Sequence, residues 1–152
     1  QAEIRSFFPD IEIMRSIPIP EAVADGALPV LEFARLFEPV SDYFLTDTWI
    51  AGNQEQPVCG FVGITGKTCD WQASARLVAE SRIPVILAGG LAPENVFEGI
   101  ISVRPAGVDS CTRTNAVDVA GCPIRFKKDI ERVRRFVSEA RRAEEELYRQ
   151  EI

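Results

Sequence analysis

The chain has 152 residues, 46% of them hydrophobic, and a formal net charge of −6 at pH 7. This length predicts one domain with its own core, because domains typically hold about 100 to 150 residues. The acidic balance argues against an extended surface for nucleic acid or anionic membrane, although a local pocket of amides and arginines can still hold one phosphate. We therefore expect a small-molecule partner, and neither a nucleic acid nor a membrane.

Hydrophobic periodicity predicts strands that alternate with helices. In chain order, it predicts a strand at Ile11–Ile17, a helix at Val30–Phe37, a strand at Asp42–Thr48, a loop at Trp49–Phe61, a helix at Trp71–Ser81, a strand at Ile83–Ala88, a helix at Pro93–Val103, a strand at Ala106–Asp109 and a final helix from about Asp129. The third strand is wholly apolar, which is typical of a parallel sheet covered on both faces. The pattern predicts a single α/β domain over residues 1–152, either a doubly wound sheet or part of a (β/α)8 barrel. The final helix ends in a mostly charged run, which predicts a solvated extension.

The cysteine and histidine content predicts no metal centre. The four cysteines lack C-x-x-C spacing and the chain has no histidine, so we expect neither a zinc site nor a cofactor. The sequence shows no signal peptide, which makes the reducing cytoplasm the expected location and the cysteines free thiols. Without histidine, acid–base chemistry must use carboxylates, cysteine or lysine.

A glycine-rich loop, Gly63–Thr68 (GITGKT), precedes one predicted helix, as phosphate-binding loops do. A nucleotide P-loop requires glycine five residues before Gly66, and that position is Phe61. We therefore do not expect a P-loop. The loop is either a different phosphate site or a plain turn.

Four polar or glycine-rich features follow the predicted strands, at the edge where α/β folds bind ligands. They are Asp47-Thr48, the Gly63–Thr68 loop, Gly89-Gly90, and Asp109 with the residues up to Arg113. The glycine pair directly precedes a helix and can offer amides to a phosphate near the positive end of the helix dipole. A tight turn between a strand and a helix needs glycine equally, so the pair alone leaves both interpretations open.

Together these strings resemble phosphoribosylanthranilate isomerase, a (β/α)8 barrel of tryptophan biosynthesis. The matching strings are Thr46-Asp47-Thr48, Gly63 to Trp71 (GITGKTCDW, against GGTGKTFDW in the family) and Val85 to Val96 (VILAGGLAPENV). The resemblance runs from about Ile11 to Ala140 and makes the four predicted strands the fifth to eighth of the barrel. It implies a carboxyl-terminal half-barrel, because a full barrel typically needs about 200 to 250 residues or more.

The resemblance also implies a reaction and roles for individual residues. The family catalyses an Amadori rearrangement of N-(5′-phosphoribosyl)anthranilate, in which the ribose ring opens and a proton moves to give a 1-deoxyribulose product. Asp47 is implied as the general acid that protonates the ring oxygen. Contacts to the substrate or its phosphate are implied for Gly63, Thr65, Gly66, Gly89, Gly90, Asp109, Cys111, Thr112 and Arg113. Of these, Asp109 is implied to lie near the anthranilate or the sugar hydroxyls.

Four features depart from the family pattern. The family's general base, a cysteine on the first strand, has no counterpart in this chain. Arg113 follows the last strand where the family has a glycine that exposes an amide to the phosphate, and Ile64 replaces the second glycine of Gly-Gly-Thr-Gly. The loop Trp49–Phe61 is longer than the corresponding family loop. These departures leave two alternatives open: a non-catalytic protein that binds a sugar phosphate, and a related barrel isomerase with a changed substrate.

A half-barrel has consequences for assembly. It leaves two open sheet edges and is expected to expose Ile11, Ile13 and Ile17, which share one parity of the first strand. We therefore expect the isolated chain to form a homo-oligomer or to pair with a missing amino-terminal half. Because the cysteine base is absent, we also expect the chain alone to be inactive.

Overall fold

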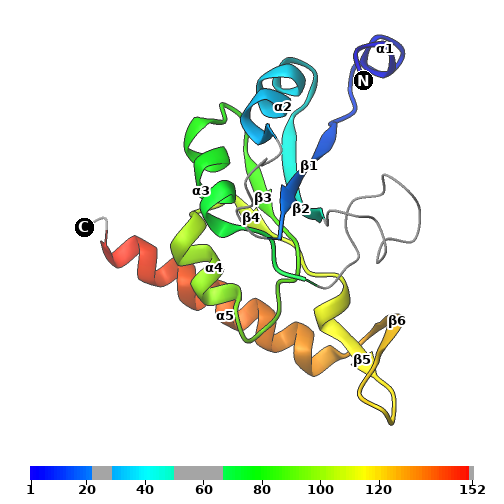
Figure 1. Ribbon diagram of the computed structural model, residues 1–152, viewed down its shortest axis with the longest axis vertical. Helices are drawn as coiled ribbons and strands as arrows, with labels where there is room; N and C mark the ends of the chain where they lie inside the picture. The colour runs from blue at the N-terminus through cyan, green and yellow to red at the C-terminus, as the bar shows by residue number, and fades with distance from the viewer. Residues whose placement is uncertain (22–28, 50–66, 151–152) are drawn as a thin grey trace.

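The computed structural model describes residues 1–21, 29–49 and 67–150, which form an α/β fold (Figure 1). Its main sheet has four parallel strands: β1 (Met14–Pro20), β2 (Tyr43–Trp49), β3 (Val85–Leu87) and β4 (Gly107–Val108). The helices are α1 (Ala2–Phe7), α2 (Val30–Phe37), α3 (Trp71–Glu80), α4 (Val96–Val103) and α5 (Ile130–Gln150), with short 3-10 turns η1 (Glu38–Val40) and η2 (Thr112–Thr114). The prediction of an α/β fold with a parallel sheet is confirmed.

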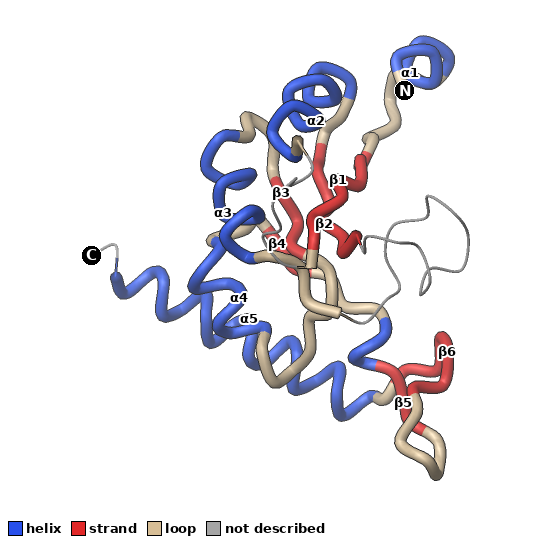
Figure 2. The backbone as a smooth tube through the Cα atoms, in the orientation of Figure 1, coloured by secondary structure: helices blue, strands red, loops and turns tan. Residues whose placement is uncertain are grey.

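The strand order is β1-β2-β3-β4, so each strand pairs with the next one along the chain. β1 and β2 pair along their whole length, from Met14 opposite Tyr43 to Pro20 opposite Trp49. Right-handed crossovers that all advance in one direction place their helices on the same face of the sheet. Figures 1 and 2 show α2, α3 and α4 in succession along one side of the sheet, with α5 running beneath α4. All four strand carboxyl ends therefore lie along one rim.

The first strand is displaced from its predicted position. The prediction was Ile11–Ile17, whereas β1 runs from Met14 to Pro20. Ile17 is fully buried, so the expectation that it is exposed on one parity with Ile11 is wrong, although Ile11 itself is 44% exposed. The prolines at 18 and 20 concealed the end of the strand, because proline is tolerated mainly in edge strands. β1 is an edge strand among the described residues.

Most other boundaries agree with the prediction within a few residues. Helix α2 has the predicted bounds, and α3 ends one residue earlier than predicted. Helix α4 begins at Val96, not at Pro93, because residues 93–95 form a turn in which the Asn95 carboxamide oxygen accepts the Ala92 amide at 2.8 Å. β3 and β4 are each shorter than predicted. The predicted loop Trp49–Phe61 lies outside the described residues except for Trp49, which ends β2.

Asp70 caps helix α3 and allows a stability prediction. Its Oδ1 accepts the amides of Gln72 at 2.8 Å and Ala73 at 3.2 Å, which have no partner within the helix. We expect Asp70→Ala to lower the free energy of unfolding by about 0.5 to 2 kcal/mol. Asp70→Ser retains a capping oxygen and should recover most of this loss. Urea denaturation of the three proteins tests the expectation, and equal midpoints for Asp70→Ala and the parent would contradict it.

Two elements were not predicted from the sequence. Helix α1 precedes β1, and Arg5 joins it to the sheet through a 2.6 Å ion pair with Asp42. An antiparallel hairpin, β5 (Asn115–Val117) and β6 (Pro123–Lys128), lies between η2 and α5 (Figure 2). The Asp118 carboxylate accepts two amides within the hairpin turn. This short-range polar turn could have indicated the hairpin.

The core lies between the sheet and helices α2 to α5. Phe44, Leu87 and Leu77 are completely buried, and they come from β2, β3 and α3. Helix α5 contributes Phe136 and Ala143 to this core, while its last turns are mostly exposed. The predicted charged, solvated end of the last helix is confirmed within the described residues.

Candidate functional site

Buried threonines join the rim of β2 to the neighbouring loops. Thr46 and Thr48 are both fully buried. The Thr46 hydroxyl accepts the Ala88 amide at 2.8 Å and lies 3.1 Å from the Ala88 carbonyl oxygen, while the Thr48 hydroxyl donates to the Lys67 carbonyl at 2.6 Å. Buried hydroxyls need such partners. The two threonines therefore fix the segments that follow β2 and β3 at the rim, a role that sequence reasoning missed.

Asp47 lies between these threonines on β2, with a half-buried side chain. Burial raises the pKa of its carboxyl group, the amide of Thr48 at 2.8 Å from Oδ1 opposes the rise, and the negative charge of Asp109 adds to it. A carboxyl group with a raised pKa retains its proton to higher pH than an ordinary aspartate. Asp47 therefore suits the role of a general acid.

Gly89 and Gly90 form a tight turn directly after β3, and both have positive φ. An added Cβ on Gly89 would lie 2.5 Å from the Thr48 hydroxyl, and one on Gly90 would lie 2.5 Å from the Thr68 amide nitrogen. The backbone requires glycine at both positions for packing and conformation. No hydrogen bond between described residues uses either glycine's amide, so both interpretations of this pair from the sequence remain compatible with the turn.

The segment after β4 lies beside this glycine turn. The Asp109 amide donates to the Leu87 carbonyl at 2.9 Å, and the Ser110 hydroxyl donates to the Leu91 carbonyl at 2.6 Å. Asp109 and Arg113 are exposed, and Cys111 and Thr112 are half-buried. The rim thus brings Asp47, the glycine turn and the segment Asp109–Arg113 together, as the strand order predicts. Gly63, Thr65 and Gly66 lie outside the described residues.

Cys69 lies beneath the glycine turn and was not singled out from the sequence. It is 3% exposed, and its thiol donates to the Ala88 carbonyl at 3.2 Å. Burial raises the pKa of the thiol, and this effect outweighs the opposing effect of the hydrogen bond with Ser74. A buried thiol that keeps its proton is a poor base or nucleophile. Cys69 is therefore a packing residue and a poor candidate for the cysteine base that the family resemblance implies.

Cys69, Cys111 and Cys122 are free thiols. Within residues 1–21, 29–49 and 67–150, no group of three or more His, Cys, Asp or Glu is arranged to hold a metal ion. None of the helices in that part of the chain combines the length and the apolar content needed to cross a bilayer.

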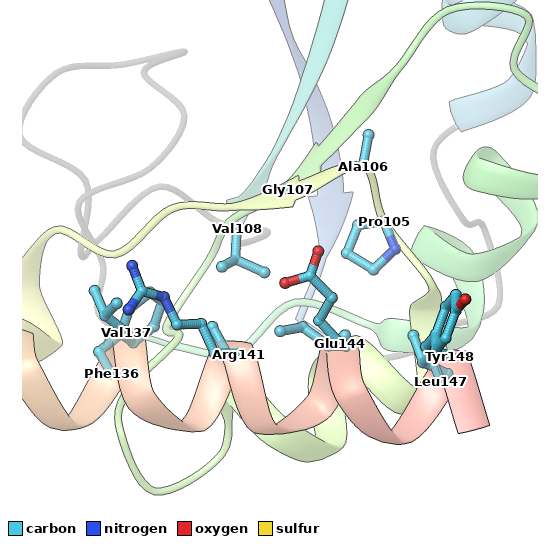
Figure 3. A pocket seen from close by; sticks show the side chains of 12 residues that line it. Pro105, Ala106, Gly107, Val108, Phe136, Val137, Arg141, Glu144, Leu147 and Tyr148 are labelled. Carbon is cyan, nitrogen blue, oxygen red and sulfur yellow. The ribbon is translucent and has the colours of Figure 1, made fainter. Parts of the chain in front are cut away.

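A pocket of about 530 Å³ lies away from the rim residues, between β4 and α5 (Figure 3). Its walls come from Ile100, Pro105, Ala106, Gly107, Val108, Phe136, Val137, Ala140, Arg141, Glu144, Leu147 and Tyr148. Figure 3 shows the Glu144 side chain rising from α5 toward the segment Pro105–Val108. No catalytic candidate from the sequence lines this pocket, which lies beside β4, the last strand of the described sheet.

Comparisons with known proteins show which family this chain resembles. The family model N-(5′-phosphoribosyl)anthranilate isomerase matches residues 3–139. The N-(5′-phosphoribosyl)anthranilate isomerase of Methanocella arvoryzae is 40% identical over 111 residues, which cover 73% of this chain and 45% of the relative. That of Methanosarcina acetivorans is 36% identical over 136 residues, covering 87% and 52%.

Solved structures of the same family have a similar fold. The phosphoribosyl anthranilate isomerase of Thermotoga maritima aligns with a TM-score of 0.63 and 26% identity, over 93% of this chain and 57% of that one. The Pyrococcus furiosus isomerase aligns with a TM-score of 0.58 and 26% identity, over 93% and 56%. This chain thus spans about half the length of the relatives it matches. With the family model matched from residue 3 to residue 139, the chain belongs to the N-(5′-phosphoribosyl)anthranilate isomerase family.

Proposed function

We propose that this chain supplies the general acid and the phosphate-binding loops of an N-(5′-phosphoribosyl)anthranilate isomerase of tryptophan biosynthesis. The observation that carries the proposal is the half-buried Asp47 carboxyl group, which has a raised pKa and lies on the same rim as the Gly89-Gly90 turn. Family membership supports the same assignment. The rim then holds an acid and an anion site next to each other.

In this proposal Asp47 gives its proton to the ring oxygen of the ribose, which allows the ring to open. Burial supports this role, because it favours the protonated carboxyl group before the reaction. The nearby Asp109 charge opposes loss of that proton. Removal of a proton from the neighbouring sugar carbon needs a general base, which the family resemblance assigns to a cysteine on the first strand of the barrel. In this proposal the amino-terminal half of the barrel supplies that base.

The sugar phosphate is proposed to bind between Gly89-Gly90 and the segment Cys111–Arg113. Backbone amides in glycine turns bind phosphates without a fixed counter-charge. Arg113 is exposed beside this segment and adds a guanidinium group, which suits bidentate contacts with phosphate oxygens. In the proposal, Gly63, Thr65 and Gly66 contribute further contacts from the glycine-rich loop.

The phosphate contact of Arg113 can be tested by direct binding. A phosphoribosyl anthranilate isomerase has been solved in complex with reduced 1-(o-carboxyphenylamino)-1-deoxyribulose 5-phosphate, and this compound is the probe. Arg113→Ala should weaken its binding by about 1.5 to 3 kcal/mol, the range for a hydrogen bond to a charged group. Arg134→Ala is the matched control, because Arg134 is a 73% exposed arginine on α5. Calorimetry that gives equal affinities for Arg113→Ala and the parent would remove Arg113 from the site.

We further infer that the chain is half of a (β/α)8 barrel. β1 and β4 end the described sheet, and a pocket lined mainly by apolar side chains lies beside β4. Near β1, Phe7 is 72% exposed and Met14 is 52% exposed. Unpaired edges beside exposed apolar side chains are typical of surfaces that pair with another segment. The partner is an amino-terminal half or a second copy of the chain.

A second candidate function is a protein that binds sugar phosphates without catalysis. The cation at Arg113, where the family pattern has a glycine, favours it. Both candidates predict that the product analogue binds, but only the first predicts turnover once an amino-terminal half-barrel with the base is supplied. A chain that fails to bind the analogue contradicts both candidates.

A further inference from the structure

Lys128, the last residue of β6, contacts the segment that follows β4. Its ammonium group donates to the Cys111 carbonyl and, at 2.9 Å, to the Thr114 hydroxyl, and the Ser110 carbonyl lies 3.5 Å away. The contact spans from the hairpin to the rim, although the two segments are 14 to 18 residues apart in sequence. The ammonium group of this exposed lysine therefore contacts two carbonyl oxygens and one hydroxyl oxygen of one short segment.

Two neighbouring side chains, Thr114 and Arg132, hold peptide groups of the same segment. Thr114 is 3% exposed, and its hydroxyl lies 3.1 Å from the Cys111 carbonyl oxygen and 3.2 Å from that of Ser110. The Arg132 Nε donates to the Arg113 carbonyl at 2.9 Å, and Arg132 is itself paired with Glu94 at 3.3 Å. Cationic side chains from β6 and α5 therefore hold three carbonyl oxygens of this segment.

The orientation of these carbonyls determines where the amides point. In a planar trans peptide, the C=O of one residue and the N–H of the next point in opposite directions, and no cis peptide bond occurs within the described residues. With the Ser110 and Cys111 carbonyls turned toward Lys128, the amides of Cys111 and Thr112 point away from it. These are two of the backbone groups proposed above to bind the sugar phosphate.

We propose that Lys128 is a positioning residue that sets the direction of the Cys111 and Thr112 amides for phosphate binding. This inference rests on the proposed function, because the phosphate site is part of it. Lys128 acts through the backbone and does not touch the ligand. Its ammonium group occupies a position lined by backbone oxygens, and the charge strengthens each hydrogen bond that it donates. The hairpin β5–β6, which carries Lys128, thereby becomes part of the support for the site.

The test compares Lys128→Met, Lys128→Arg and the control Lys127→Met in the whole chain by amide NMR. Lys127→Met removes the same charge one residue earlier, from another exposed position. Lys128→Met should shift or broaden the Cys111 and Thr112 amide resonances, and added methylammonium should reverse the change by replacing the missing ammonium group. Lys128→Arg, which retains a cation, should resemble the parent more closely than Lys128→Met does. Lys127→Met should leave both resonances unchanged.

A titration with inorganic phosphate separates this inference from the proposed function. In the parent, phosphate should shift the Cys111 and Thr112 resonances, and Lys128→Met should weaken binding about tenfold or more through loss of two oriented amides. A parent that does not bind phosphate contradicts the proposed function, and the resonances still decide whether Lys128 sets the loop. Parent-like resonances and affinity in Lys128→Met would overturn the inference. If Lys128→Met does not fold, the Lys128→Arg variant decides the question. Displaced Cys111 and Thr112 resonances in Lys128→Arg that added methylammonium does not restore would overturn the inference as well.

Discussion

Asp47→Asn should reduce turnover by about 10² to 10⁴ in an isomerase completed with an amino-terminal half-barrel, the range expected for loss of a general acid. The completed enzyme is this chain fused behind the corresponding half of the Methanocella arvoryzae relative. Asparagine keeps the size of the side chain and can still accept the Thr48 amide, which lies 2.8 Å from Oδ1. Binding of the product analogue should therefore change much less than kcat. Equal turnover in Asp47→Asn and the parent fusion would reduce Asp47 to a structural residue.

The pH dependence gives an independent readout of the same group. An acid must carry its proton, so kcat of the parent fusion should fall as pH rises through the raised pKa of Asp47. Asp109→Asn removes a nearby negative charge that raises this pKa, so the fall should move to lower pH. A profile in Asp109→Asn that is unchanged, or displaced to higher pH, would contradict the electrostatic account of the pair.

Gly90→Ala should lower the free energy of unfolding by about 2 to 5 kcal/mol. The positive φ of 64° costs an alanine about 1 to 2 kcal/mol. Its Cβ would also overlap the backbone of Lys67 and lie 2.5 Å from the Thr68 nitrogen, which adds about 1 to 3 kcal/mol of overpacking. The added Cβ is fixed to the backbone of residue 90 and would meet the backbone of Lys67 and Thr68. Relief of the overlap would therefore displace one of these two rim segments.

Gly121→Ala separates the two contributions. Gly121 also has a positive φ, 80°, but an added Cβ there has no neighbour within 4 Å. Gly121→Ala should therefore cost only about 1 to 2 kcal/mol, from backbone strain alone. Denaturation curves of both variants and the parent give the comparison. Equal losses of unfolding free energy in the two variants would show that the close approach of Gly90 to residues 67 and 68 adds no cost beyond backbone strain.

The sequence predicted the parallel sheet because hydrophobic periodicity and strand-ending glycines are local signals. Helix α2 and the rim positions of Asp47 and Gly89-Gly90 follow from such signals. The position of β1 does not, because prolines within a strand resemble a strand end. The sequence pattern therefore located the rim more accurately than the first strand.

The contacts that shape the rim were not predictable from the sequence. Thr46 reaches Ala88, and Lys128 reaches Cys111, across separations of 42 and 17 residues. Nothing in the local pattern around Thr46 or Lys128 distinguishes them from ordinary strand residues. Such side-chain-to-backbone contacts depend on the register of the sheet and the path of the hairpin, which local periodicity does not determine.

Turnover of N-(5′-phosphoribosyl)anthranilate by the fusion, compared with each half alone, tests the central claim most directly. We predict that the fusion is active, that this chain and the amino-terminal half are each inactive alone, and that adding Asp47→Asn to the fusion removes most of the activity. Sedimentation of this chain alone should show self-association through its open edges. A stable monomer of this chain that turns over the substrate by itself would contradict the half-barrel account, and a folded fusion that binds the product analogue without turnover would contradict the isomerase assignment.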